Sequence, residues 1–412
     1  MPYTVTGHLI LHEFAGKAAE NMTPSMDPYI RNEREAAIAE RADRLAARFA
    51  PRAAEHDREG SFPFENFEDL KQSGYLKLTV PEAYGGEEAS AYELVLSQER
   101  LARGDGSTAL AVGWHVHTLM KLRLSRSWPE PLFVRLCQDI VRDGIVINEL
   151  ASEPATGSPT RGGRPETTAR RTDGGWLLTG RKTFSTLSPI LERFTVTAGF
   201  EGSGKVGSFL VHRGPGVQVE ETWNTLGMRS TGSHDVVLSD VFVPDEETIV
   251  GLDSASPAAP FAPTEASMLH IPACYIGIAW AARDFALEFA RSHKPNSLTV
   301  PIAELPNIKR QLGLIEADWL AARSYLYGIA DRWDRDEQGR AELKTELGLA
   351  KYIATNAAIS IVDQAMRIVG GLSLSRSYPL ERMYRDVRAG LHNPPMDDVV
   401  LTNLANRALA ES

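Results

Sequence analysis

Residues 147–159, INELASEPATGSP, and residues 175–188, GWLLTGRKTFSTLS, lie in the stretch that decides the architecture of this chain. The apolar run from Gly144 to Ile147 leads into a Pro-punctuated turn that contains Ser152 and Ser158. Small residues in such a turn let backbone N–H groups approach a flat or anionic ligand closely. The first string therefore predicts one wall of a cofactor site.

The second string places an aromatic ring, Phe184, two residues before a hydroxyl, Thr186. On a β-strand this spacing puts both side chains on one face. The ring can then pack against a planar cofactor while the hydroxyl reaches one of its edge atoms. The order and spacing of the two strings within residues 145–188 indicate that they belong to one site.

The composition is that of a globular protein with a large core. The chain has 412 residues, 43% of them apolar, and a net charge of −10, which predicts two or three domains. Such a chain lacks the basic face that a nucleic acid or an anionic membrane requires. Cys137 and Cys274 cannot form a disulfide framework, and no stretch has transmembrane length or a signal-peptide pattern. We expect a soluble cytoplasmic protein without nucleic-acid or membrane partners.

The first third of the chain is predicted to be helical. Residues 1–27 show no period and are expected to form an arm. Helical signal begins at Asp27-Pro28, an N-cap followed by proline, and extends over residues 28–143 with a break at Gly104–Gly106. The apolar stripe of its first helix consists of Ile38, Ala42, Leu45 and Phe49.

The spacing of apolar residues changes from a helical to a strand-like pattern at Gly144, and it becomes helical again about a hundred residues later. Short apolar runs separated by turn residues predict antiparallel strands in a sandwich or barrel over residues 144–256. The Ala/Pro/Ser-rich segment 254–263 predicts a linker. Residues 264–412 are again helical, and Gly370-Gly371 ends a long helix with an Ala-rich seam, Glu342 to Val369.

From about Pro28 to Ala410 the chain resembles the acyl-CoA dehydrogenase superfamily of flavoenzymes. The resemblance rests on LTVPEAYGG, LARGDGSTAL, SEPATGSP, GRKTFST, LGMRSTGSHDVVLSDVFVP, RIVGG and YPLERMYRDVR, in the family's order. It implies a multidomain α+β fold with an N-terminal α-helical domain, a middle antiparallel β-domain and a C-terminal four-helix bundle. It also implies a homodimer or homotetramer, a flavin, usually FAD, between the β-domain and the bundle, an acyl-CoA substrate and an electron-accepting flavoprotein.

The resemblance also implies roles for individual residues. The family's flavin-binding turn falls on residues 150–158, where Ser152 meets the pyrimidine edge and Ser158 binds phosphate. Phe184 replaces a Trp whose ring lies against the isoalloxazine, and Thr186 replaces a hydroxyl donor to the reactive ring nitrogen. Residues 367–371 correspond to the segment that contacts the adenosine end of the neighbouring subunit's FAD. The expected cofactor-binding residues are Leu150, Ser152, Ser158, Phe184, Thr186, Gly370 and Gly371.

The chain departs from the family pattern at the catalytic base and at the pyrophosphate loop. Most members have a Glu shortly after the Arg-Asp pair that corresponds to Arg385-Asp386, and Pro394 occupies its position here. An alternative position, at the start of the first bundle helix, falls on Ser267. The family's Arg-Thr-Phe-Gly loop is replaced by RSHKPNSLTVP, where His293 and Lys294 could supply positive charge.

Other titratable groups could replace the missing Glu. His392 lies two residues before the lost position, and imidazole titrates near neutral pH, so His392 is the candidate catalytic residue. The alternative interpretation is that it only orders the Pro-Pro turn. His115 and His117 cannot share a helical face, and we expect core or cleft residues there and no metal site. The remaining candidates for the base are Glu265, His270, Asp397 and Asp398.

Three functions remain open from the sequence. The leading hypothesis is an acyl-CoA dehydrogenase that oxidises a thioester at its α,β carbons and passes the electrons to FAD. The second is a monooxygenase on the same fold that uses FMN or free reduced flavin from a partner flavin reductase. The third is a non-catalytic acyl-CoA-binding protein, which the retained SEPATGS and KTFST strings disfavour.

Overall fold

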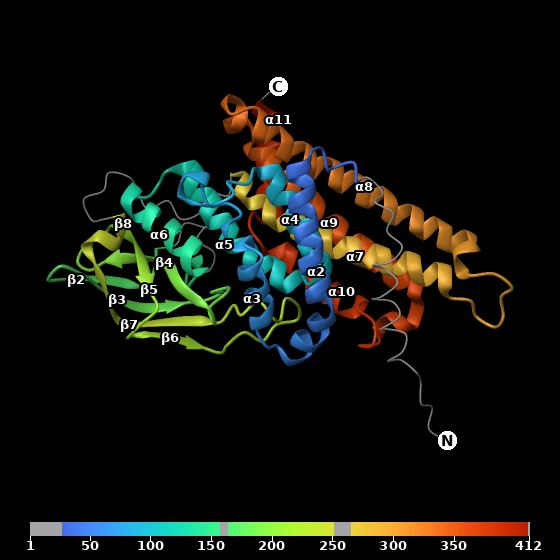
Figure 1. Cartoon of the computed structure of the whole chain (residues 1–412), viewed down its shortest axis with the longest axis horizontal. Helices are drawn as coiled ribbons and strands as arrows, with labels where there is room; N and C mark the ends of the chain where they lie inside the picture. The colour runs from blue at the N-terminus through green and yellow to red at the C-terminus, as the bar shows by residue number, and fades with distance from the viewer. Residues whose placement is uncertain (1–26, 157–163, 251–264, 411–412) are drawn as a thin grey trace, which may run out of the picture.

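The protein is described by a computed structural model that covers residues 27–156, 164–250 and 265–410. The strands gather at one end of the molecule, and helices from both ends of the sequence pack together at the other (Figure 1). The order α, then β, then α is the predicted one. Ser158, the linker 254–263 and the arm up to residue 26 lie outside the described residues.

Capping residues set the boundaries of the N-terminal helices. Asp105 separates α4 from α5 and accepts hydrogen bonds from the first backbone N–H groups of α5, so the predicted break at Gly104–Gly106 is confirmed. The helices are α2 (Glu33–Glu59), α3 (Phe64–Gln72), α4 (Ala91–Gly104), α5 (Gly106–Ser125) and α6 (Glu130–Asp143).

The predicted helix start at Asp27-Pro28 is wrong. The helix begins at Glu33, behind an Asn32 side chain that accepts a hydrogen bond from the third helical N–H. The Asp27 carboxylate is instead paired with two buried guanidinium groups, those of Arg100 and Arg323. The tertiary ion pairs therefore decide the conformation of a residue whose local sequence predicts a cap.

The sheet is largely antiparallel, with one departure from the prediction. Strand order is β6-β7-β3-β2-β4-β5-β8, and β1 pairs with β4. Strand β4 runs parallel to both β1 and β2, which requires crossover connections. The strands are β1 (Val146–Leu150), β2 (Thr168–Thr172), β3 (Gly175–Lys182), β4 (Leu191–Phe200), β5 (Val206–His212), β6 (Val217–Glu220), β7 (Asp235–Pro244) and β8 (Thr248–Val250).

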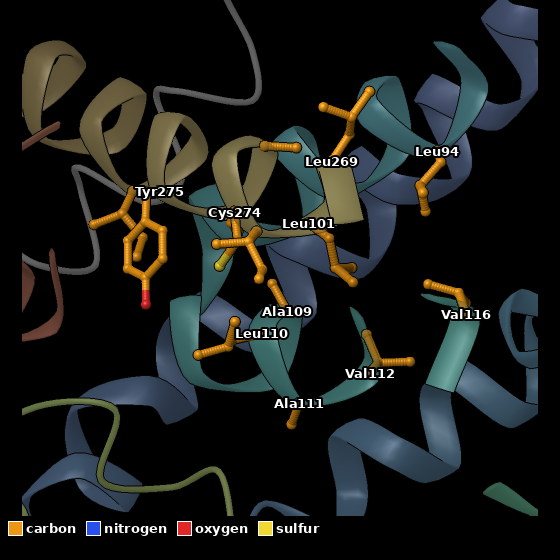
Figure 2. Packing of buried hydrophobic residues seen from close by; sticks show 14 of the residues in the cluster. Leu94, Leu101, Ala109, Leu110, Ala111, Val112, Val116, Leu269, Cys274 and Tyr275 are labelled. Atoms are coloured by element: carbon orange, nitrogen blue, oxygen red, sulfur yellow. The ribbon is translucent and has the colours of Figure 1, made fainter. Parts of the chain in front are cut away.

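The C-terminal helices pack against α4 and α5 through a continuous apolar core, part of which Figure 2 shows around Leu101, Leu110 and Cys274. Helices α4 and α7 cross so closely that Gly277 has no room for a side chain. A Cβ at this position would lie 2.1 Å from the Glu99 carbonyl oxygen. The helices are α7 (His270–Ser292), α8 (Pro306–Arg335), α9 (Lys344–Val369), α10 (Leu380–Arg388) and α11 (Asp397–Ala410).

Residues 338–374, α9 with its flanking turns, are long and apolar enough to cross a membrane by length and composition. The expectation that the chain has no such stretch is therefore wrong. The apolar seam of α9, which includes Leu347, Ala354 and Ile361, is buried, and α9 packs on α7 and α8. This is the arrangement of a core helix in a bundle.

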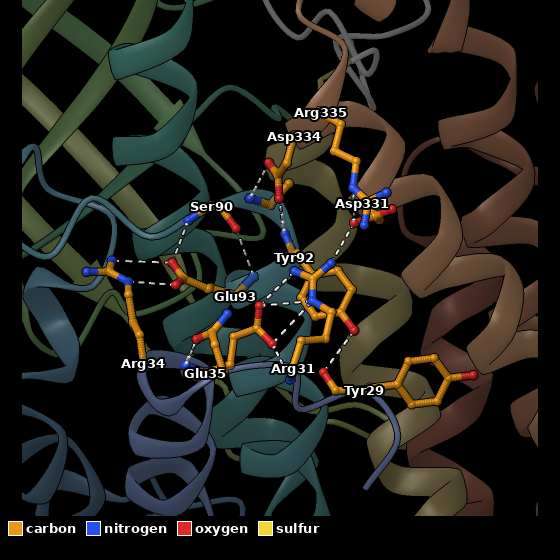
Figure 3. Close-up of polar contacts among 12 residues, drawn as sticks. Tyr29, Arg31, Arg34, Glu35, Ser90, Tyr92, Glu93, Asp331, Asp334 and Arg335 are labelled. Carbon is orange, nitrogen blue, oxygen red and sulfur yellow. Dashed lines mark hydrogen bonds and ion pairs between the residues drawn. The ribbon is translucent and has the colours of Figure 1, made fainter.

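Polar contacts join α8 to the first turn of α4 (Figure 3). The Asp334 carboxylate accepts hydrogen bonds from the backbone N–H groups of Ala91 and Tyr92. Ser90 and Glu93 form a capping box at the same helix end. A carboxylate at a helix N-terminus is stabilised by the helix dipole, so these contacts fix the bundle on the N-terminal helices.

Candidate active site

The turn after β1 is tied to the segment after β3. Leu150 is buried at the end of β1, and Ser152 is half-buried. The Ser152 carbonyl oxygen accepts a hydrogen bond of 2.9 Å from the Thr183 backbone N–H. This bond brings together the two strings that the sequence predicts to share one site.

A buried ion pair lies beneath this junction. Lys182 Nζ donates to Glu153 Oε1 and, at 2.8 Å, to the Thr197 carbonyl oxygen. The Glu153 carboxylate also accepts from Thr167 Oγ1 at 2.6 Å. Although burial opposes it, the ammonium of Lys182 lowers the pKa of Glu153. Both side chains are at most 1% exposed, so the pair holds the turn to the sheet.

Phe184 and Thr186 do not lie on a strand, and this prediction is corrected. Strand β3 ends at Lys182, and Phe184 has a φ of +53° in the turn that follows. The Phe184 ring is 67% exposed and meets the Trp223 ring edge-on at a centroid distance of 5.7 Å. The left-handed turn, not strand alternation, presents this aromatic surface.

The Thr186 hydroxyl belongs to a directed chain of hydrogen bonds. Thr231 Oγ1 donates to the Met228 carbonyl at 3.1 Å, because a carbonyl oxygen only accepts. Thr231 therefore accepts from Ser233 Oγ at 2.7 Å, and Ser233 accepts from Thr186 Oγ1 at 2.8 Å. In this arrangement the Thr186 proton points to Ser233. Thr186 then offers an oxygen lone pair to a ligand, which differs from its predicted role as a donor.

Two successive residues of β1 have polar partners in other segments. Asn148 Nδ2 donates to the Thr186 carbonyl at 3.0 Å. The next residue of β1, Glu149, is paired with Lys121 of α5 at 2.8 Å. Both charges of this pair act on the Glu265 carboxyl, which precedes α7. Lys121 and Glu149 are therefore charged neighbours of Glu265, a candidate base from the sequence.

Glu265 has the environment that a proton-accepting carboxylate requires. Its side chain is half-buried, and its Oε2 atom is buried without a hydrogen-bond partner among the described residues. Burial raises the pKa of Glu265, Lys121 opposes this change, and Glu149 adds to it. Desolvation makes a carboxylate more basic than it is in water, which suits a group that takes a proton from carbon.

The other candidate bases have different surroundings. His392 is exposed at the end of the turn Ala389–His392. Asp397 is paired with Lys351 at 3.1 Å and accepts from Asn356 Nδ2 at 3.0 Å, so it fixes α11 to α9. Asp398 is exposed. In the described part of the chain, Glu265 and His270 are the candidates with a buried side-chain atom that has no hydrogen-bond partner, and Glu265 is the carboxylate of the two.

The remaining predicted cofactor residues lie at helix ends. Gly370, with a φ of +71°, ends α9, and Gly371 follows it; both are exposed. His293 ends α7 and stacks on Phe289 at a ring distance of 4.6 Å, and Lys294 follows it. Lys294, Gly370 and Gly371 are exposed, and their contact with a neighbouring subunit's cofactor stays a prediction.

His115 and His117 are buried, as expected for core or cleft residues. His115 Nδ1 accepts from the Ile147 N–H at 3.1 Å, so its Nε2 donates to the Leu76 carbonyl at 2.7 Å. Burial lowers the pKa of His115 to about 4 and that of His117 to about 3. His115 therefore joins three segments as a neutral structural group.

Sequence analysis missed several residues that organise the site. Glu153 and Lys182 form a buried ion pair. Both charges lie next to apolar strands within the two quoted strings, and this position was the signal in the sequence that could have revealed the pair. Lys121 and Glu149 come together from α5 and β1, and no local pattern links them. Ser233 lies in a Gly/Ser turn, and its hydrogen-bond partner, Thr186, is far away in the sequence.

The residues present fit a flavin. An exposed aromatic ring, a backbone turn with small residues and an edge hydroxyl, those of Phe184, Ser152 and Thr186, lie on adjoining segments. A planar cofactor could pack on the ring with its polar edge at the turn. When bound there, a flavin would supply hydride acceptance.

Comparisons with known proteins agree with this arrangement. Residues 32–125, 149–241 and 269–393 match the family models for the N-terminal, middle and C-terminal domains of acyl-CoA dehydrogenase. YdbM of Bacillus subtilis (strain 168), an acyl-CoA dehydrogenase by provisional assignment, is 47% identical over 384 residues, which cover 93% of this chain and 99% of YdbM.

A nitrososynthase and a protein with bound FMN are also similar. The amino sugar nitrososynthase RubN8 of Streptomyces rubradiris is 34% identical over 374 residues, 86% of this chain and 84% of RubN8. The structure of KijD3 in complex with FMN and a dTDP-linked amino keto sugar has a TM-score of 0.79 at 26% identity, covering 92% of this chain and 95% of KijD3. From its three domains and these relatives, the chain belongs to the acyl-CoA dehydrogenase family of flavoenzymes.

Proposed function

We propose that the protein dehydrogenates an acyl-CoA thioester, with Glu265 as the base that replaces the missing family Glu. The observation that carries this proposal is the buried, unpartnered Oε2 of Glu265, together with the raised pKa of its carboxyl. The similarity to YdbM supports the same reaction class.

The reaction requires a carboxylate near the substrate's α carbon. Glu265 takes the α-proton as the electron pair of that C–H bond moves into the new α,β double bond. The β carbon would lose its hydrogen as a hydride, with its electron pair, and a flavin held at this site would supply the acceptor. The positive charge of Lys121 opposes the rise in the pKa of Glu265 that burial causes, and it favours the ionised form that can accept a proton.

The surroundings of Pro394 and His392 support the relocated base. Pro394 carries no titratable group, and the preceding Asn393 amide oxygen accepts a hydrogen bond from the buried Tyr275 hydroxyl. His392 is exposed beside it. A base must be desolvated to be effective against a carbon acid, and Glu265 satisfies this condition better than His392.

The test is anaerobic reduction of the bound flavin by a panel of acyl-CoAs of different chain length, followed by absorbance. We expect bleaching by one chain-length class and a fall of 10²-fold or more, on the order given for a general base, in Glu265→Gln. Glu246→Gln, at an exposed carboxylate of the β-domain, is the matched control and should bleach at the wild-type rate. Unchanged bleaching in Glu265→Gln would show that another group is the base.

The second candidate is a monooxygenase that receives reduced flavin. The specific observation in its favour is the hydroxyl chain, which leaves Thr186 as an acceptor suited to the N–H of a reduced flavin. The similarity to RubN8 points the same way. If no thioester bleaches the flavin and the pre-reduced protein gives an oxygen-dependent absorbance transient with air, this function replaces the dehydrogenase.

We further propose that the protein is a cytoplasmic homodimer or homotetramer that passes electrons to a partner flavoprotein. Exposed apolar side chains on α8 and α11, including Leu320 and Leu401, support self-association. Arg367, Gly370 and Gly371 are exposed, which leaves them accessible to a neighbouring subunit. Light scattering at several protein concentrations tests the assembly, and a monomer at all of them would contradict it.

A further inference from the structure

Unpartnered polar atoms cluster where α7 begins. Glu265 Oε2, Ser267 Oγ and His270 Nε2 are buried, and no group in the described ranges hydrogen-bonds to any of them. A buried polar atom without a partner costs about 1–3 kcal/mol, and such atoms are few in native proteins. Three of them within six residues leave hydrogen-bonding capacity that a polar group of a bound ligand could satisfy.

The protonation of His270 follows from its one hydrogen bond. Nδ1 lies 2.9 Å from the Ser267 carbonyl oxygen, which can only accept, so Nδ1 carries the proton. Burial lowers the pKa of His270 well below its usual value, and the ring is neutral at physiological pH. Nε2 therefore presents a lone pair and requires a donor.

The imidazole is held in place by α5. A Cβ on Gly113 would lie 2.6 Å from His270 Cδ2, so only glycine leaves room for the ring. Trp114 meets the ring edge-on at a centroid distance of 4.9 Å, and His117 lies at 5.1 Å. A ring fixed on several sides is pre-organised to recognise a donor in one direction.

Ser267 and His270 are three residues apart across the start of a helix, a spacing that brings side chains to one side. The Ser267 hydroxyl can donate, and His270 Nε2 can accept. A ligand hydroxyl satisfies both, because it accepts one hydrogen bond and donates another. A plain alkyl chain satisfies neither and leaves both atoms unpartnered.

We propose that Ser267 and His270 recognise a hydroxyl group on the acyl portion of the substrate, two residues beyond the Glu265 base. This inference rests on the proposed dehydrogenase function and names its substrate class. The substrate is a hydroxyacyl thioester, and the hydroxyl donates to His270 Nε2 and accepts from Ser267 Oγ.

The test compares hexanoyl-CoA with hexanoyl-CoAs that carry a hydroxyl at carbon 4, 5 or 6, by kcat/KM for anaerobic flavin reduction. We expect one hydroxylated isomer to exceed hexanoyl-CoA about tenfold, the effect of about 1.4 kcal/mol from well-made hydrogen bonds. Ser267→Ala should reduce this ratio towards one. It should not lower the melting temperature of the substrate-free protein, because Ser267 Oγ has no protein partner to lose.

Ser97→Ala is the matched control. Ser97 is equally buried, but its hydroxyl donates to the Leu94 carbonyl at 3.1 Å and accepts from Tyr75. This variant should melt at a lower temperature and keep the wild-type ratio.

The outcomes separate this inference from the proposed function. If hexanoyl-CoA bleaches the flavin as well as every hydroxylated isomer, the dehydrogenase stands and the hydroxyl inference falls. A melting temperature of Ser267→Ala as low as that of Ser97→Ala also overturns it, because Ser267 would then have a structural partner. If no thioester bleaches the flavin, the dehydrogenase falls and its substrate inference falls with it.

Discussion

Removal of the Lys182 ammonium should destabilise the cofactor turn. In Lys182→Met the apolar stem of the side chain remains, but Glu153 and the Thr197 carbonyl oxygen each lose a donor. Glu153 keeps its hydrogen bonds from Thr167 and from the Glu166 backbone N–H. The perturbation therefore leaves a carboxylate buried at 1% exposure without its counter-charge.

The expected cost follows from this burial. Breaking a buried ion pair by removal of one partner costs about 3–5 kcal/mol, since the remaining charge stays desolvated. For a unit of 150–250 residues each kcal/mol lowers the melting temperature by about 2–4 °C, which gives roughly 6–20 °C. Because the pair holds the turn that carries Ser152, flavin affinity should fall as well.

Thermal unfolding, followed by circular dichroism, and flavin titration measure the two effects. The double variant Glu153→Gln/Lys182→Met removes both charges, and it should lose less stability than the sum of the single variants. Additive losses, or a melting temperature of Lys182→Met within about 2 °C of wild type, would refute the account of a coupled buried pair.

Three further predictions concern single side chains. Thr186→Val should change the ratio of the affinities for oxidised and reduced flavin, because the Thr186 hydroxyl donates to Ser233 and offers a lone pair to the flavin. Equal changes in both affinities would show that Thr186 does not contact the reactive nitrogen. His392→Ala should leave thioester-driven flavin reduction within about threefold of wild type, a small factor next to that of a general base, and lost turnover would make His392 the base. In the folded protein the pKa of His115 is about 4, below its ordinary value in the unfolded chain. Its contribution to the free energy of unfolding is therefore complete above about pH 6.5, where the ring is neutral in both states. Stability should fall by about 3 kcal/mol between pH 6.5 and 4 through this group, a loss that urea titrations of His115→Gln should lack.

Much of the fold could be predicted from the sequence, because its causes are local. The stripe Ile38, Ala42, Leu45 and Phe49 is buried as its period requires, and Asp105 separates two helices as a capping residue does. The strings around Ser152 and Thr183 are in hydrogen-bond contact. Propensity did not determine the start of α2 or the turn at Phe184, where long-range ion pairs and a left-handed backbone override the local pattern.

The candidate site depended on tertiary contacts. Several titratable groups lie near the two expected positions in the sequence, which offers no physical criterion to choose among them. That choice required burial and partners, and both arise between segments far apart in the chain. Lys121 and Glu149 converge on Glu265, and Gly113 of α5 makes the space for His270 of α7. Sequence by itself determined the order of helical and β segments, because periodicity and caps are local. Only the tertiary structure decided which polar atoms remain buried and unpartnered, because desolvation is a property of the packed molecule.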